Sequence, residues 1–170
     1  MSQFSGTLLQ HGAVMEDLSQ EAAMTYAGYA GGEDLQWPLS VDIPSGLPGF
    51  EHANRFLLAP LADGLEPFMG LACEDDQAAS FVLVPPGVFF EDYTIEIYDE
   101  YVDALELEGP GDVVVMVMVT LAQPPAECTV NLLGPIVINR RNMRASQVVQ
   151  YKSDYRVAVP ISAVTAHWKG

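Results

Sequence analysis

The side chains of this chain best suited to general acid–base chemistry are its three histidines, His11, His52 and His167. His11 and His167 lie near the two ends of the sequence. His52 follows a Pro-Gly-Phe turn, and no neighbouring residues would complete a catalytic triad with it. The sequence contains no GxSxG, HExxH, GxxxxGKS/T or GxGxxG motif. These observations predict a binding protein rather than an enzyme.

The sequence offers one candidate metal site, the consecutive acids Glu74, Asp75 and Asp76. Consecutive carboxylates point in different directions, unlike the alternating ligands of a calcium-binding loop, so we expect solvated loop acids or helix-capping acids instead. Cys73 and Cys128 are far apart and form no CxxC pair, which predicts free, buried or half-buried thiols. We therefore predict no bound metal and no cofactor.

Charge is distributed very unevenly along the chain. The net charge is −16, and of the seven basic residues only Arg55 precedes Arg140. Direct binding to nucleic acid or to an anionic membrane depends on Lys and Arg, so this composition argues against both. A basic protein partner is favoured instead, although acidic surfaces also serve solubility.

The sequence changes character at Trp37. Residues 1–36 are rich in Gly, Ala, Ser and Gln and contain one helix candidate at residues 16–30, which predicts a partly ordered N-terminal arm or helix. From Trp37 to residue 162, short apolar segments alternate with turns, and residues 163–170 form a C-terminal tail. The N-terminus lacks the pattern of a secretory signal, and no apolar run approaches the ~20 residues that span a bilayer. We predict a cytoplasmic protein.

The pattern after Trp37 predicts an all-β fold, a barrel or a sandwich, with one or two short helices. Residues 94–98 alternate between apolar and polar and predict a strand with one buried face. Residues 113–121 are almost wholly apolar and predict a central strand packed on both faces. Residues 99–108 predict a short acidic helix. The complete set of predicted strands is 55–59, 68–72, 80–84, 94–98, 113–121, 128–133, 136–138, 146–150 and 156–159.

Four sequence blocks, in this order and spacing, resemble the FliW family of flagellar assembly factors. They are LPGFE at residues 47–51, CEDDQAASFVLVPPGVFFEDY at 73–93, NLLGPIVINRRNMR at 131–144 and ASQVVQ at 145–150. The resemblance extends over roughly residues 37–161. It implies a small antiparallel β-barrel-like domain that is not an enzyme.

The resemblance also implies two protein partners. Members of this family bind flagellin through the flagellin C-terminal region, and they bind CsrA, a small RNA-binding dimer that represses translation. Export of flagellin frees the factor to capture CsrA. A strongly acidic protein is steered electrostatically towards a basic RNA-binding surface, which is compatible with that role.

The family motifs carry over to ten positions that we predict to contact partners: Glu74, Asp75, Asp76, Phe90, Asp92, Tyr93, Asn131, Pro135, Ile136 and Asn139. For Asn131, Ile136 and Asn139 the alternative is a strand-edge or core role that fixes a tight turn. Met116 and Met118 fit either ordinary core or a pliable groove for a flagellin helix. Arg140, Arg141 and Arg144 fit either a basic patch or ion pairs with the acidic helix.

Two other functions remain open from the sequence. One is a dedicated flagellin chaperone without a CsrA role, and the other is a small-ligand-binding or hydrolytic β-barrel. The second would require polar residues that converge around a cleft.

Overall fold

The computed structural model describes residues 37–65, 67–90, 92–122 and 127–161. The predicted arm at residues 1–36, with its helix at 16–30, and the predicted tail at 163–170 lie outside the described residues. The rest of the predicted domain can be compared with the structure element by element.

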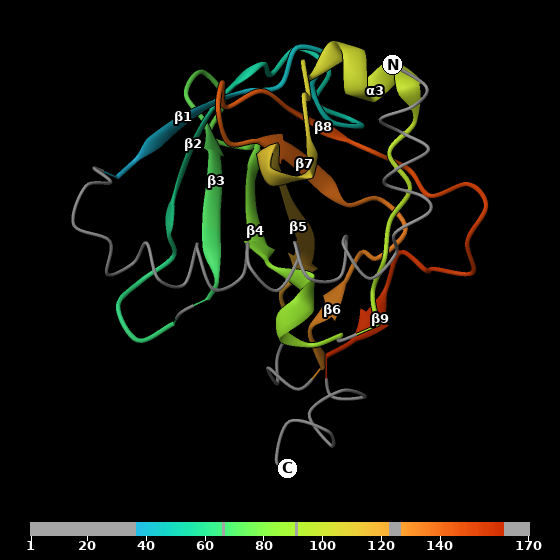
Figure 1. Cartoon of the computed structure of the whole chain (residues 1–170). Helices are drawn as coiled ribbons and strands as arrows, with labels where there is room; N and C mark the ends of the chain where they lie inside the picture. The colour runs from blue at the N-terminus through green and yellow to red at the C-terminus, as the bar shows by residue number, and fades with distance from the viewer. Residues whose placement is uncertain (1–36, 66, 91, 123–126, 162–170) are drawn as a thin grey trace.

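In the described part of the chain, the regular secondary structure is almost entirely antiparallel sheet, which confirms the predicted all-β fold (Figure 1). Its order is β1-β2-β3-β4-β5-β6-β9, and β7 and β8 branch from β5. One α-helix, α3 (Asp99–Ala104), lies beyond the end of the sheet near β8. The strands are β1 (Leu39–Asp42), β2 (Arg55–Pro60), β3 (Met69–Cys73), β4 (Ser80–Val84), β5 (Val113–Thr120), β6 (Thr129–Val130), β7 (Ile136–Asn139), β8 (Ala145–Gln147) and β9 (Val159–Pro160).

The sheet curls towards a barrel without closing. At the seam between β1 and β8, Asp42 forms a single parallel bridge with Arg144, and its N–H donates a 2.9 Å hydrogen bond to the carbonyl of Met143. Both strands otherwise keep a free edge on this side, within the described residues. Because no ladder joins β1 to β8 among the described residues, the chain segments that follow these two strands are free to separate.

The central strand β5 separates two hydrophobic cores, as its unbroken apolar sequence predicts. Val114 and Met116 face the inner core, whose other buried residues come mostly from β1–β4, β7 and β8. Val115 and Val117 face the outer core, whose other residues come mostly from the segment at residues 84–107, which has no strand beyond Val84, and from residues 128–148, which include β6 and β7. All four side chains are at most 1% exposed. Since each buried valine contributes about 1.5–3 kcal/mol, β5 anchors both halves of the domain.

The predicted strand at residues 94–98 is wrong, because this segment has no backbone ladder. Its alternation of side chains is nevertheless real, since Ile95 and Ile97 are buried in the outer core. Side chains take the place of a neighbouring strand. The Tyr155 hydroxyl bonds both backbone groups of Thr94, and the Gln150 amide bonds both backbone groups of Glu96.

Other predicted boundaries also change. The acidic helix ends at Ala104 rather than at residue 108, because Glu106 adopts a left-handed conformation with φ 57° that ends a helix. The strand β1 was not predicted, since it is short and half-exposed. The strands predicted at 128–133, 146–150 and 156–159 shrink to β6, β8 and β9, because their remaining residues form loops.

Candidate partner-binding site

The predicted acidic residues lie on the loop that joins β3 to β4. Glu74 and Asp75 are exposed, whereas Asp76 is half-buried. One carboxylate oxygen of Asp76 accepts a 3.0 Å hydrogen bond from the Ala78 N–H, and the other lies 2.8 Å from Nε2 of His52. The contact with His52, and then that with Ala78, lowers the pKa of Asp76. His52 thus has an acidic partner that the sequence did not reveal. Asp76 shapes the loop, and Glu74 and Asp75 face solvent.

The second predicted group follows the 3-10 turn Pro86–Val88. Asp92 is exposed and Phe90 is half-buried against the outer core. Tyr93 is only 3% exposed, and its hydroxyl donates a 2.7 Å hydrogen bond to the carbonyl of Leu132. Burial, and then the neighbouring Tyr155, raises the pKa of Tyr93. Tyr93 therefore fastens the outer segment to the sheet, while Asp92 and part of Phe90 remain accessible.

The third predicted group surrounds a bulge between β6 and β7. Both strands run along the same edge of β5: Val119 pairs with Val130, and Met116 pairs with Ile136. Residues 117–118 of β5 therefore face residues 131–135 of the neighbouring strand, two residues against five. In place of the expected tight turn, these residues form a large bulge that interrupts one long strand.

Asn131 and Gln147 hold this bulge in shape. The Oδ1 of Asn131 accepts a 2.9 Å hydrogen bond from the Gly134 N–H, and the Nε2 of Gln147 donates one of 2.9 Å to the Gly134 carbonyl. A Cβ atom at Gly134 would lie 2.7 Å from Nε2 of Gln147, so glycine leaves room for this amide. Pro135 is buried beside the bulge, and Ile136 is fully buried in the inner core. Asn131 is half-buried and borders solvent.

An apolar groove of about 360 Å³ opens beside the bulge, on the side of the barrel seam. Gly46, at φ 67°, turns the chain after β1 towards one side of the groove, and Gln147 ends β8 on the other. Met118 is half-buried and lines the groove, whereas Met116 is fully buried in the inner core. The groove is lined by Leu47, Pro48, Phe81, Met118, Asn131, Leu133, Gly134, Gln147, Val149 and Val157.

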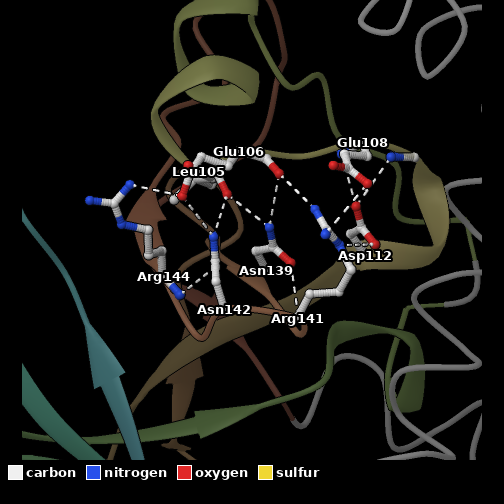
Figure 2. A network of polar contacts seen from close by, with 9 residues as sticks. Leu105, Glu106, Glu108, Asp112, Asn139, Arg141, Asn142 and Arg144 are labelled. Atoms are coloured by element: carbon white, nitrogen blue, oxygen red, sulfur yellow. Dashed lines mark hydrogen bonds and ion pairs between the residues drawn. The ribbon is translucent and has the colours of Figure 1, made fainter.

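Asn139, the last predicted contact residue, is fully buried in a polar network (Figure 2). Its Nδ2 donates hydrogen bonds to the carbonyls of Leu105 (2.8 Å) and Glu106 (3.2 Å), and its Oδ1 accepts one from the Arg141 N–H. Asn142 donates to the same Leu105 carbonyl from an exposed position. Asn139 thus ties β7 to the end of α3.

Arginines complete this network with ion pairs. Arg141 contacts Asp112 at 2.9 Å and Glu108 at 3.4 Å, and Arg144 contacts Glu106 at 3.2 Å. Burial acts to raise the pKa of Asp112, but the Glu108 N–H, Arg141 and the Gly109 N–H together hold it below its usual value. These contacts support the second role considered for the arginines: Arg141 and Arg144 form ion pairs with acids on the segment that follows α3.

Known proteins share this arrangement of strands and motifs. The model of the FliW protein family matches residues 29–161. The chain belongs to the FliW family. The flagellar assembly factor FliW of Bacillus licheniformis is 36% identical over 133 residues, which cover 78% of this chain and 92% of the relative. That of Bacillus subtilis (strain 168) is 37% identical over 117 residues, 69% of this chain and 81% of the relative.

A crystal structure of the flagellar assembly factor FliW shows that the fold is shared as well. It matches with a TM-score of 0.68 and 32% sequence identity, over 72% of this chain and 84% of that chain. The family match begins eight residues before the predicted domain boundary at residue 37, so part of the predicted arm resembles the family. The boundary itself stays a prediction.

The described residues of this FliW family member contain no group of three His, Cys, Asp or Glu side chains that could hold a metal ion. Within the same part of the chain, no helix is long and apolar enough to cross a membrane. Cys73 and Cys128 are both buried free thiols. The sequence analysis left Met116 and Met118 between core and groove; the structure places Met118 in the groove lining and Met116 in the core, and the other lining residues were not predicted.

Proposed function

We propose that this chain is a cytoplasmic, non-enzymatic regulator that binds the C-terminal region of flagellin and antagonises a CsrA-like RNA-binding dimer by partner exchange. The observation that carries this proposal is the family match over residues 29–161, together with relatives named flagellar assembly factor FliW. Two surfaces of the domain support it, one apolar and one acidic.

The apolar groove suits an amphipathic helix or extended segment from flagellin. Its lining is mainly hydrophobic, and the half-buried Met118 can adapt to an irregular partner. Val157 stands on its border with 61% of its surface exposed. A partner that buries Val157 and Met118 would gain hydrophobic free energy without requiring the core to rearrange.

The groove is tested with a matched pair of variants, Val157→Asp and Leu121→Asp. Leu121 is 63% exposed and does not line the groove, so both substitutions place a carboxylate on an equally accessible apolar position. We expect Val157→Asp to weaken binding of a flagellin C-terminal fragment at least about tenfold, because an unpaired charge would be desolvated. Leu121→Asp should leave the affinity unchanged in titration calorimetry. Equal affinities for the two variants would contradict the hypothesis that flagellin binds in the groove.

The acidic loop suits the basic surface of an RNA-binding dimer. Glu74 and Asp75 are exposed and take part in none of the ion pairs found among the described residues. Asp76 is engaged by His52 and Ala78 and contributes charge from a fixed position. The other predicted contacts, Asp92 and Phe90, follow the opposite end of β4 from this loop, so they would have to meet a partner at a separate surface.

The loop is tested by reversing Glu74 and Asp75 to lysine while Asp76 is kept, so that the turn stays intact. The control is the double variant Asp63→Lys/Glu127→Lys, which changes the net charge equally at two other exposed positions. At low salt, we expect the association rate with a CsrA-like dimer to fall about tenfold more for the loop variant. Equal rates in stopped-flow measurements would show that overall charge, rather than the loop, steers the encounter.

Partner exchange itself is tested by competition. Two ligands that weaken each other's binding must do so by the same factor, because linkage between binding equilibria is reciprocal. A flagellin C-terminal fragment should therefore release the chain progressively from immobilised CsrA. Binding of flagellin with no detectable binding of CsrA would identify a dedicated flagellin chaperone.

A further inference from the structure

Three tyrosines from two segments of the chain gather at α3, on a surface that neither the groove nor the acidic loop includes: Tyr98 and Tyr101 at the start of the helix, and Tyr151 after β8. The rings of Tyr98 and Tyr101 have centroids 6.4 Å apart, and those of Tyr98 and Tyr151 are 6.2 Å apart. Tyr98 and Tyr101 are half-buried against the outer core. Tyr151 is 73% exposed, the largest exposed fraction among the big hydrophobic side chains of the described residues. We call these three residues the tyrosine patch.

Carboxylates border the tyrosine patch. Burial raises the pKa of Tyr98, and the nearby charge of Glu96 adds to this effect. Burial likewise raises the pKa of Tyr101, and here the added charge is that of Glu100. Glu96 and Tyr98 alternate with the buried Ile95 and Ile97, so their side chains share the outward face of this segment, and Glu100 is adjacent to Tyr101 in sequence.

The two ends of the α3 region differ in how their acids are neutralised. After the helix, Glu106 and Glu108 pair with Arg144 and Arg141. At its start, the exposed Glu100 joins none of the ion pairs formed by the part of the chain that the structure describes. The charge of Glu100 therefore has no counter-charge among the described residues.

Lys152 shows that a cation can bind beside the tyrosine patch. Nζ of Lys152 lies 4.0 Å from Oε1 of Glu96, at the limit of an ion pair, and the Lys152 side chain is 78% exposed. A contact this long and this exposed is readily replaced. Lys152 follows Tyr151 in sequence, so a cation from another molecule that replaced Lys152 at Glu96 would bind at the border of the tyrosine patch.

We propose that the tyrosine patch is a docking site for an arginine side chain of a partner protein. Tyrosine faces attract cations, and a planar guanidinium can stack on a ring while it bonds a carboxylate, which a compact ammonium does less well. The charge of Glu96 and Glu100 complements a cation and opposes a phosphate-bearing ligand. This inference does not depend on the identity of the partners proposed above.

The inference is tested on the full chain by nuclear magnetic resonance with an acetylated, amidated tetra-arginine peptide as probe. A tetra-citrulline peptide of the same shape, which carries no charge, serves as the ligand control. We expect the arginine peptide to shift the ring signals of Tyr98, Tyr101 and Tyr151, and the citrulline peptide to leave them in place. Shifts confined to the acidic loop at residues 74–76 would overturn the assignment.

Two pairs of variants separate the tyrosine patch from general charge attraction. Tyr151→Ala should weaken the arginine peptide about two- to fivefold, the range of an exposed cation–π contact. Leu121→Ala, a truncation of similar exposure outside the patch, should not weaken it. Lys152→Gln should strengthen binding more than Arg55→Gln, which removes the same charge on β2. Unchanged affinity for Tyr151→Ala, or equal gains from the two charge removals, would refute the site.

Discussion

On the inner side of β5, strands β1–β4, β7 and β8 satisfy one another's backbone groups through ladder hydrogen bonds, whereas on the outer side a few side chains do this work. Gln150 bonds both backbone groups of Glu96, Tyr155 bonds both of Thr94, and Tyr93 anchors to Leu132. A ladder distributes its stability over many similar contacts. The outer layer concentrates its stability in single residues, so it should be the more fragile half.

The proposed binding surfaces are divided between these halves. The groove and the acidic loop border the inner core, while the tyrosine patch belongs to the outer layer. A rigid inner half suits surfaces that must keep their shape when partners exchange. The outer layer can open locally at a lower cost in free energy, because fewer contacts hold it.

The hydrogen bonds of Asn139 tie β7 to the segment after α3 and so join the inner half to the outer half; we call this contact the joint. Breaking it should have the largest effect on stability. Asn139→Ala removes the donor for the carbonyls of Leu105 and Glu106 and the acceptor for the Arg141 N–H, all at a fully buried position. Asn142 and Arg141 still donate to these two carbonyls, so the cost is that of three lost hydrogen bonds at about 0.5–1.5 kcal/mol each, and we expect a loss of roughly 3 kcal/mol in the free energy of unfolding. Urea denaturation measures it.

Asn142→Ala is the matched control for this joint. Asn142 offers the same amide to the same Leu105 carbonyl, but from an exposed position where water can replace it. Its loss should cost less than about 1 kcal/mol. Equal destabilisation by the two variants would show that burial of Asn139 does not set the strength of the joint.

An intermediate effect is expected from Gln150→Ala in the outer layer. Gln150 is 3% exposed, and its loss leaves both backbone groups of Glu96 and the carbonyl of Val148 without a partner. We expect a loss of about 2 kcal/mol and faster hydrogen exchange at Glu96, while amides of β3 stay protected. Gln147→Ala removes a half-buried amide at the bulge and should cost less. If β3 exchanged as fast as Glu96 in Gln150→Ala, the two halves would open together.

The sequence predicted the inner half better than the outer half, and the reason is physical. Periodicity reports which side chains are buried, so β2, β3, β4, β5 and β7 were found within one or two residues. At residues 94–98 the periodicity was equally correct about Ile95 and Ile97, yet the prediction of a strand was wrong. Alternation of burial does not reveal whether the backbone pairs with a strand or with the side chains of Gln150 and Tyr155.

The candidate site divides in the same manner. The exposed acids Glu74 and Asp75 could be placed on a loop from the sequence, since consecutive charged residues rarely lie in a core. The groove could not, because it exists only where the seam, the bulge and Met118 meet in space. Asn139 and Asn131 were recognised as positions of interest, but only the structure shows that their amides hold the joint and the bulge.

The smallest expected effect concerns pH and the ion pairs at the joint. The folded-state pKa of Asp112 is lowered, so its carboxylate stabilises the fold above the ordinary aspartate pKa of about 3.9, and this contribution disappears as the pH falls through the lowered value. Wild-type stability should therefore decline below about pH 4, and the stability of Asp112→Asn should decline less steeply.

The difference in stability between the two proteins should stay below about 1 kcal/mol, because the Arg141 side chain is 44% exposed and salt screens its ion pair with Asp112. Thermal unfolding between about pH 3 and pH 7 measures both curves. Parallel curves would mean that Asp112 contributes through the shape of its turn, where it accepts hydrogen bonds from the N–H groups of Glu108 and Gly109, rather than through its charge.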